Sequence, residues 1–241
     1  MKTIDVSIVI PAFNEAQRLP SFLDQVAAFC TQSARTYEII LVDDGSRDNT
    51  LQVAESYKGR LPGLRIIPGR PNRGKGWAVK TGLLESSGDL CLFMDADGSV
   101  HPEEIEKNLH AVREGGCDIF IGSRILKGAD QVLRIRWHRK LIGIVFAFLT
   151  RRFLLGEIRD TQCGFKIFRR EVIRPLLAKT RLNGFGFDME ILYLASLMGY
   201  KIKEGPVSWR HVTGSKVNLF SDSVRMFINL WQIKKWHRAP G

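Results

Sequence analysis

Short apolar and β-branched runs alternate with amphipathic stretches through the first half of the chain. Five runs have the length and composition of buried strands: Val6–Ile10, Glu38–Val42, Arg65–Ile67, Leu90–Met94 and Asp118–Gly122. The stretches between them are typical of helices. This alternation predicts an α/β fold in which a mostly parallel sheet carries helices on both faces.

Polar loops follow three of these strands. Pro11–Glu15 follows the first strand, Asp43–Ser46 the second and Asp95–Gly98 the fourth. In open α/β sheets, ligands bind beyond the carboxyl ends of the strands. We therefore expect these loops to form one site.

The alternation weakens from about Lys127 onward. This part contains a basic segment, an apolar run at Leu141–Leu149 and a final helix, with no Pro- or Ser-rich linker between them. The simplest prediction is one domain with an elaborated second half.

Composition and charge narrow the choice of partner. The chain has 241 residues, 44% of them hydrophobic and 25% charged, which is enough to bury a sizeable core. Lysine and arginine number 36 against 25 aspartates and glutamates, so the net charge is +11. Such an excess favours an anionic partner, which would be nucleic acid, a phosphate-bearing substrate or an acidic lipid surface.

Several classes of protein are excluded. Four scattered cysteines without a C-x-x-C pair favour reduced thiols over a disulfide scaffold or a zinc site. Met1–Asp5 leads directly into a strand, so we expect no signal peptide. The apolar run Leu141–Leu149 is shorter than the roughly 18 to 20 residues that cross a bilayer. We therefore expect no transmembrane helix.

Asp95 and Asp97 flank one small residue directly after an apolar strand. Two carboxylates this close can share a hard divalent cation, Mg²⁺ or Mn²⁺, which can neutralise a departing diphosphate. A strand-ending turn favours the same residue types. The pattern alone leaves both interpretations open.

Asp43 and Asp44 repeat the pattern of a strand followed by acidic residues. A carboxylate here can accept hydrogen bonds from a base N–H or a ribose hydroxyl, whereas Asp48 suits a helix cap. We assign Asp43 and Asp44 to binding and Asp48 to capping.

The segment Gly69–Lys75 fits the G-x-x-x-x-G-K pattern of a phosphate loop, which raises the alternative of a P-loop nucleotide hydrolase. Against it, Gly76 stands where that loop needs a Ser or Thr for magnesium, and Pro71 suits a cradle of backbone N–H groups poorly. Gly74–Gly76 is better interpreted as a basic turn that approaches a nucleotide's diphosphate.

Taken together and in order, the loops resemble the family-2 glycosyltransferases with a GT-A fold. The segments that carry this resemblance are Pro11–Glu15, Val42–Ser46, Asn72–Gly76, Asp95–Gly98 and Gly122–Arg124. Further segments are similar to the dolichyl-phosphate β-glucosyltransferases and their prokaryotic polyprenyl-phosphate relatives: Asp160–Lys166, Phe187–Glu190, Val207–Trp209 and Gly214–Lys216. The resemblance runs from about Val6 to Lys216.

The resemblance implies a GT-A (Rossmann-like) catalytic domain over residues 1–216, with a basic interfacial segment at 134–155, and a C-terminal amphipathic basic helix over 217–241. It implies a nucleotide-sugar site formed by Pro11, Ala12, Asn14, Glu15, Asp43, Asp44, Gly45, Lys75, Asp95 and Ala96. Asp95 and Asp97 would hold the metal. The catalytic residues would be Asp97, Arg124 and Asp188, and the acceptor phosphate would face Arg124, Arg139 and Lys216.

One position departs from the pattern. Some relatives of the mannosyl branch have a metal-coordinating glutamine where this chain has Ser99. Water or substrate oxygens would then complete the coordination.

A lipid monophosphate acceptor needs no general base, since its second pKa of about 6 leaves it largely deprotonated at neutral pH. Single in-line displacement would invert the anomeric centre and give a β-linked lipid phosphosugar. A hydroxyl acceptor would need a base, and the resemblance offers Asp188. A structural alternative for Asp188 is capping of a helix at 189–198.

Basic residues flank the two apolar helical segments. Arg134, Arg136, His138, Arg139 and Lys140 precede Leu141–Leu149, and Arg151 and Arg152 follow it. The final helix has a narrow polar stripe at Asp222, Arg225, Asn229 and Gln232 and ends in tryptophans and lysines. Such segments are typical of a membrane interface. The first also fits a buried core helix, and the wide apolar surface of the final helix could also be buried by the protein core or by a partner subunit.

No common nucleic-acid-binding module is present, so we expect no nucleic-acid partner. We expect an inverting, metal-dependent glycosyltransferase, peripheral on the cytoplasmic face of a membrane, that moves a hexose to a polyprenyl or dolichyl phosphate. UDP-glucose is the favoured donor, and GDP-mannose and UDP-N-acetylhexosamine stay open. The alternatives are the same fold with a hydroxyl acceptor, and a P-loop-like or non-enzymatic nucleotide-binding protein.

Overall fold

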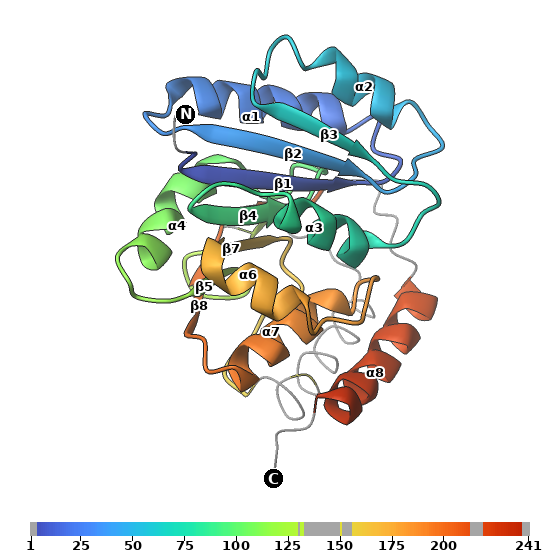
Figure 1. Ribbon diagram of the computed structural model, residues 1–241, viewed down its shortest axis with the longest axis vertical. Coiled ribbons are helices and arrows are strands. Elements are labelled where there is room, and N and C mark those ends of the chain that lie inside the picture. Colours follow the sequence, from blue (N-terminus) through green and yellow to red (C-terminus); the bar gives the residue numbers. More distant parts are fainter. Residues whose placement is uncertain (1–3, 130, 133–149, 151–155, 213–218, 238–241) are drawn as a thin grey trace.

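The computed structural model describes residues 4–129, 131–132, 150, 156–212 and 219–237. A seven-stranded sheet in the order β3-β2-β1-β4-β7-β5-β8 forms its centre (Figure 1). The strands are β1 (Val6–Ala12), β2 (Tyr37–Asp43), β3 (Leu64–Pro68), β4 (Leu90–Met94), β5 (Ile119–Ser123), β7 (Phe165–Arg169) and β8 (Ile202–Pro206). Only β7 runs antiparallel to its neighbours in this sheet. The prediction of a mostly parallel α/β sheet is confirmed.

Alternate side chains of each strand enter two apolar cores, one on each face of the sheet. On β1, Ile8 and Ile10 enter the core that also buries residues of α1 (Leu19–Gln32), α2 (Thr50–Ser56) and α4 (Glu103–Arg113). Val9 enters the other core, with residues of α3 (Lys75–Leu84), α6 (Arg170–Leu177) and α7 (Phe187–Leu197). Helices therefore cover both faces, as predicted.

The strand β7 was not among the predicted strands. Its second residue is Lys166, a fully buried lysine, so β7 lacks the continuous apolar run that β4 has. The strand lies between β4 and β5, with Phe165 opposite Met94. This register brings the residues just before β7 to the carboxyl end of β4, beside Asp95.

The edge strand β8 was also missed. Its sequence is Ile-Lys-Glu-Gly-Pro, and most of its side chains are partly or fully exposed. An edge strand of this kind carries little apolar signal.

The last helix, α8 (Leu219–Trp236), lies beside α7 and away from the sheet (Figure 1). Leu230 and Ile233 pack against Met189 of α7 in a small third core. Asn229, from the predicted polar stripe, is buried, whereas Ile228 and Trp231 are 52% and 70% exposed. The inner face of α8 therefore combines apolar side chains with an amide, and the outer face is partly apolar.

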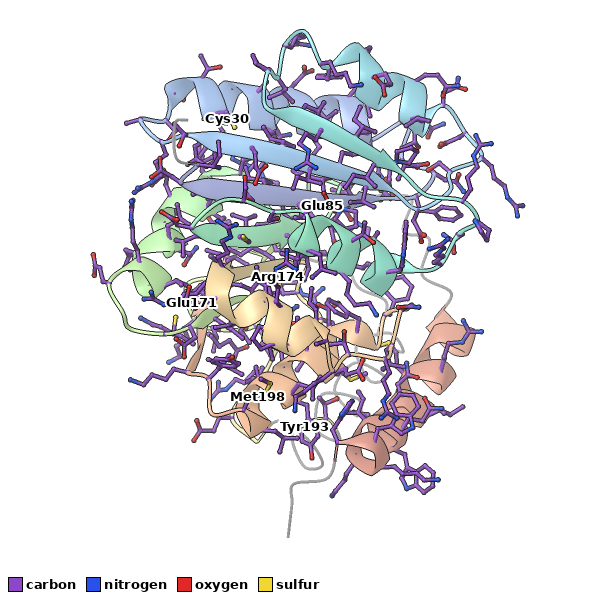
Figure 2. The ribbon with its side chains drawn as sticks, viewed as in Figure 1. Cys30, Glu85, Glu171, Arg174, Tyr193 and Met198 are labelled. Carbon is purple, nitrogen blue, oxygen red and sulfur yellow. The ribbon has the colours of Figure 1, made fainter. Side chains whose placement is uncertain are left out.

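Side chains fill the space between the sheet and its helices (Figure 2). Tyr193 and Met198 pack against the core beneath α7.

A separate two-stranded sheet joins β6 (Gln131–Val132) to β9 (Trp209–Arg210). The four cysteines are free, in agreement with the expected reduced thiols. Of the helices that the structure describes, none combines the length and apolar character that crossing a bilayer requires.

Candidate active site

The loops after β1 and β2 are joined by hydrogen bonds. The backbone N–H of Asn14 donates to Ser46 Oγ at 2.8 Å, and the N–H of Arg47 donates to Asn14 Oδ1 at 2.7 Å. Asn14 adopts φ 54°, a left-handed conformation that Asn tolerates well. Its amide oxygen is therefore engaged within the protein. Asn14 joins the two loops at the place where we expected the nucleotide base to bind.

Glu15 is also engaged within the protein. Its carboxylate accepts two hydrogen bonds from Arg18, at 2.5 and 2.7 Å, and its backbone N–H donates to Thr50 Oγ1 at 2.6 Å. The third guanidinium nitrogen of Arg18, Nη1, lies 3.9 Å from Asp97. Arg18 thus links the first loop to the predicted metal carboxylate, a role that the sequence pattern did not indicate.

The two carboxylates after β2 have different surroundings. Asp43 accepts the N–H of Ser46 at 3.2 and 3.3 Å and closes its own turn. Asp44 accepts hydrogen bonds from the side chain of Asn72 and from the N–H groups of Arg73 and Gly74, each at 2.8 Å. Burial, with a contribution from Asp43, raises the pKa of Asp44 despite these donors. Asp44 therefore fixes the segment that ends in Lys75.

This segment packs tightly on the β2 loop. Gly45 has φ 76°, and a Cβ at that position would lie 2.9 Å from Asn72 N. A Cβ on Gly76 would lie 2.5 Å from Phe187. Only glycine fits these two contacts, so the backbone on both sides of Lys75 is held in place.

Lys75 begins α3, and its ammonium points to the carboxyl end of β4. Its Nζ lies 2.7 Å from Asp95 Oδ1 and 3.9 Å from Asp188 Oδ2. Burial opposes the charge of Lys75, but the two carboxylates outweigh it and raise the pKa of Lys75. For Asp95, removal from water and the nearby Asp97 raise the pKa, although Lys75 opposes them.

Gly164 shapes the pocket around Asp95. The N–H of Asp95 donates to Gly164 O at 3.1 Å, and a Cβ on Gly164 would lie 1.9 Å from Asp95 Oδ2. The carboxylate therefore occupies the space that a side chain on Gly164 would fill. The segment Asp160–Lys166 contributed to the family resemblance, but the sequence did not indicate that Gly164 contacts Asp95 at the end of the neighbouring strand.

Asp97 lies on the other side of Ala96 and is 29% exposed. Its Oδ1 accepts the N–H of Ser99 at 2.9 Å, which fixes the carboxylate in a turn. Both the turn and a binding role were predicted for this pair of aspartates, and the turn is present. A hollow of about 660 Å³ adjoins Asp97, with Arg18 and Arg210 among its lining residues.

Asp188 is buried and paired. Its Oδ1 accepts a hydrogen bond from the fully buried Lys166 Nζ at 2.6 Å, and Lys166 also donates to Cys163 O at 2.8 Å. The helix α7 begins at Phe187, and its N-cap Gly186 has no side-chain cap. The expected helix at 189–198 thus begins two residues earlier, and the contacts of Asp188 are ion pairs rather than a helix cap.

Arg124 is held by Asp160 through two parallel hydrogen bonds of 2.8 Å, and its backbone N–H donates to the same carboxylate at 2.9 Å. Its guanidinium also lies over the ring of Trp209, 5.8 Å from the centroid. Burial opposes the charge of both groups, but their pairing lowers the pKa of Asp160 and raises that of Arg124. Arg124 is therefore a fixed cation.

Comparisons with known proteins identify the family. The sequence model described as "Glycosyl transferase family 2" matches residues 7–177. The chain belongs to glycosyl transferase family 2. The resemblance predicted from the loops is confirmed, and the P-loop hydrolase interpretation of Gly69–Lys75 is wrong.

Relatives of this family-2 glycosyltransferase extend over nearly the whole chain. A protein of Dictyostelium discoideum named dolichyl-phosphate beta-glucosyltransferase is 36% identical and aligns with 96% of this chain and 77% of its own length. A Drosophila melanogaster protein of the same name is 37% identical, over 96% of this chain and 74% of its own length. The predicted similarity to this branch is confirmed.

Solved structures support the fold. Glucosyl-3-phosphoglycerate synthase from Mycobacterium tuberculosis, in complex with Mn²⁺, uridine diphosphate and phosphoglyceric acid, superposes with a TM-score of 0.69 at 21% identity. The match covers 95% of this chain and 78% of that one. At this identity the likeness shows the GT-A fold, as predicted.

Some predicted residues of this family-2 enzyme lie outside the described part of the chain. They are Arg139, Lys216 and the basic segment at 134–155, apart from Thr150. Their predicted contacts with the acceptor phosphate and the membrane stay predictions.

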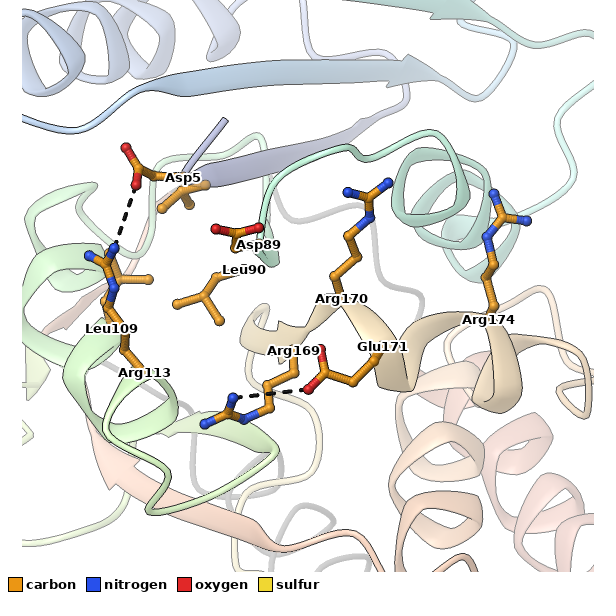
Figure 3. Close-up of a pocket in the computed structure, with 10 residues that line it drawn as sticks. Asp5, Asp89, Leu90, Leu109, Arg113, Arg169, Arg170, Glu171 and Arg174 are labelled. Atoms are coloured by element: carbon orange, nitrogen blue, oxygen red, sulfur yellow. Dashed lines mark ion pairs between the residues drawn. The ribbon is translucent and has the colours of Figure 1, made fainter. Parts of the chain in front are cut away.

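A second hollow, of about 540 Å³, lies at the opposite edge of the sheet (Figure 3). Asp5 pairs there with Arg113 at 3.5 Å, and Glu171 lies 4.0 Å from Arg169. None of the predicted site residues lines it. The candidate active site is therefore the carboxyl edge, where Asp95, Asp97 and Lys75 meet.

Proposed function

We propose that this family-2 enzyme transfers glucose from a nucleotide sugar to a polyprenyl or dolichyl phosphate and gives a β-linked lipid phosphosugar. The observation that carries the proposal is the match, over 96% of the chain, to proteins named dolichyl-phosphate beta-glucosyltransferase. The geometry of the carboxyl edge is compatible with this chemistry.

The pairing of Asp188 supports a reaction without a general base. Asp188 Oδ1 already accepts a 2.6 Å hydrogen bond from the buried ammonium of Lys166, so that oxygen is engaged within the protein. A lipid monophosphate needs no deprotonation at neutral pH, because its second pKa is about 6. The work of the protein is then to hold two anionic substrates in line and to stabilise the leaving diphosphate.

The donor we favour is UDP-glucose. In this proposal the ends of β1 and β2 hold the nucleoside, with Pro11 and Ala12 forming the floor and Asp43 accepting a hydrogen bond from the base or the ribose. Asn14, Glu15, Asp44 and Gly45 keep the loops in register through contacts within the protein. Lys75, Asp95 and Ala96 then face the diphosphate.

A divalent cation, Mg²⁺ or Mn²⁺, fits the carboxylates of Asp95 and Asp97. Hard oxygen donors of this kind are the ligands that both metals prefer, and Asp95 already accommodates the cationic group of Lys75 at 2.7 Å. When bound, the metal would neutralise charge on the leaving diphosphate. Asp97 is held for this role by Ser99 and by the nearby Arg18.

The acceptor phosphate is assigned to Arg124. Asp160 and Trp209 hold its guanidinium in one orientation, which reduces the entropy lost when an anion binds. We further propose that Arg139 and Lys216 contribute to the same anionic site. Asp97, Arg124 and Asp188 form the proposed catalytic set. In this proposal Asp188 balances the positive charges of Lys166 and Lys75 and does not act as a base.

We also propose that the enzyme is peripheral on the cytoplasmic face of a membrane. In this proposal residues 1–216 form the catalytic domain, with the basic segment at 134–155 facing lipid, and residues 217–241 form an interfacial helix. The exposed Ile228 and Trp231 on α8, beside the exposed Lys235, have the amphipathic chemistry of such a surface. No nucleic-acid partner is proposed.

A panel of donors tests the proposal. The purified chain would be incubated with UDP-glucose, GDP-mannose or UDP-N-acetylglucosamine, a short polyprenyl phosphate, and either Mg²⁺, Mn²⁺ or a chelator. We expect lipid-linked glucose from UDP-glucose in the presence of metal. Transfer of another sugar would overturn the donor assignment, and full activity with the chelator would remove the metal from the mechanism.

A further inference from the structure

The ammonium of Lys75 occupies the place where a metal would meet Asp95. It lies 2.7 Å from Asp95 Oδ1, and its side chain is only 17% exposed. It also lies over the ring of Phe93, 5.7 Å from the centroid. A divalent cation that binds the same carboxylate oxygen is repelled by this ammonium at contact distance, so the two cations compete for Asp95.

Asp95 is the main anionic partner of Lys75. The other nearby carboxylate, Asp188, is 3.9 Å away and already accepts the 2.6 Å hydrogen bond of Lys166. Displacing Lys75 from Asp95 without a new anion would leave a largely buried ammonium with a weaker partner. Such a loss is unfavourable in a site shielded from water.

The protein offers few further ligands for a metal. Within the ranges that the structure describes, no group of three His, Cys, Asp or Glu side chains is arranged to hold a metal ion. A cation bound to Asp95 and Asp97 would need additional oxygens, and a nucleotide diphosphate supplies them. The same diphosphate would offer Lys75 a new anionic partner.

The backbone around Lys75 would not need to move. Asp44 accepts the N–H groups of Arg73 and Gly74, and Gly76 is in close contact with Phe187. The lysine side chain has a flexible four-carbon stem, so its ammonium can turn while its Cα stays in place.

We propose that Lys75 competes with the divalent cation for Asp95, so that metal binds tightly only together with the nucleotide diphosphate. Lys75 then acts as a positioning residue, one that holds the empty site in shape and moves to the diphosphate when donor and metal arrive. The inference rests on the proposed metal site of the transferase. It adds that the metal and the nucleotide diphosphate bind together, which two carboxylates without a competing lysine would not require.

The test measures Mn²⁺ binding without any sugar donor or acceptor. Wild type, Lys75→Met and Lys75→Arg would be titrated with Mn²⁺, and free Mn²⁺ would be followed by electron paramagnetic resonance, with and without UDP. Lys58→Met is the matched control, since Lys58 carries the same charge but pairs with Glu55 on the surface. Adding Asp95→Asn to Lys75→Met tests whether the metal is at Asp95.

Without UDP, we expect Lys75→Met to bind Mn²⁺ about tenfold more tightly than wild type, which corresponds to about 1.4 kcal/mol. Lys75→Arg and Lys58→Met should match wild type, and Asp95→Asn should cancel the gain. With UDP, the advantage of Lys75→Met should disappear, because the diphosphate releases Asp95 in the wild type. Equal or weaker Mn²⁺ binding by a folded Lys75→Met protein would overturn the proposal.

Lys75→Gln provides the same comparison if Lys75→Met does not fold, because its amide can still donate to Asp95. The Mn²⁺ readout is independent of sugar transfer. A chain with the predicted Mn²⁺ behaviour but no lipid-linked product would contradict the proposed function and leave this inference standing.

Discussion

Because Gly164 has no side chain, it leaves room for the carboxylate of Asp95 in the candidate site. The space next to its Cα holds the carboxylate of Asp95, 1.9 Å from where a Cβ would be. No adjustment of a flexible side chain relieves this contact without moving the predicted metal ligand. The position therefore links the segment before β7 to the chemistry after β4.

We predict that Gly164→Ala lowers glucosyl transfer by about 100-fold, the loss expected when a reacting group is displaced by about 1 Å. Gly59→Ala is the control, since a Cβ there meets nothing within 4 Å. Steady-state kinetics and circular dichroism would be measured for both. Unchanged kcat in Gly164→Ala would show that Asp95 does not need its present position.

The ion pair of Asp160 with Arg124 should make folding stability depend on pH. Arg124 lowers the pKa of Asp160 below its ordinary value of 3.8. A carboxylate with a lowered pKa adds stability above its unfolded pKa, and this contribution is lost as pH falls through the folded value. The loss of stability from this ion pair is therefore expected at acid pH, below 3.8.

We predict that Asp160→Asn lowers the free energy of unfolding by about 2 kcal/mol at neutral pH, because Arg124 loses its charged partner. The difference from wild type should shrink as pH falls below 3.8. Urea unfolding on both sides of that pH measures it. A difference that stays constant into the acid range would mean that the pair is not responsible.

The position of the acidic residues could be predicted from the sequence, whereas their partners could not. Asp95 and Asp97 directly follow an apolar strand, so the local pattern placed them at the carboxyl edge of the sheet, and their binding of a metal stays a prediction. Lys166 on β7 pairs with Asp188 on α7, and Gly164, just before β7, contacts Asp95 at the end of β4. Such contacts depend on strand order, which a single sequence does not contain.

Among the elements, α8 has two faces with different tasks. Ile233 is fully buried against α7, and Asn229 packs against Gly186, close to the start of the helix that carries Asp188. Trp231 on the outer face is 70% exposed. The buried face stabilises the fold, and the proposed membrane surface lies opposite.

We predict that Ile233→Ala lowers the free energy of unfolding by about 2 to 4 kcal/mol, as for other buried aliphatic side chains. Trp231→Ala should leave stability within about 0.5 kcal/mol and weaken binding to vesicles that contain anionic lipid. Urea unfolding and vesicle co-sedimentation of the two variants separate the two faces. Undiminished vesicle binding by Trp231→Ala would contradict the assigned membrane surface.

The strands of the first half could be predicted because each is a short apolar run. The ladder of β1 continues two residues beyond the predicted Ile10, where Pro11 and Ala12 pair with β2. The strand β7 could not be predicted, since a buried lysine interrupts its apolar residues. That lysine, Lys166, forms the ion pair with the buried Asp188. The strand that departs from the expected apolar pattern therefore also contributes a charged group to the site.

For the molecule as a whole, the charge of +11 indicated an anionic partner without identifying it. Within the described residues, Lys75 and Arg124 lie at the carboxyl edge of the sheet, and Lys235 lies on α8. This distribution suits a phosphate-bearing substrate at the sheet edge and a lipid surface along α8. The positions of these cations therefore support both proposals more specifically than their number does.

The central claim is that the acceptor is a phosphate and that no base is needed. The most direct measurement compares two acceptors of equal prenyl chain length, one ending in phosphate and one in hydroxyl, with UDP-glucose and Mn²⁺, and analyses the product by NMR. We predict a β-linked glucosyl phosphate from the first and no product from the second. Transfer to the hydroxyl, or an α-linked product, would contradict the account.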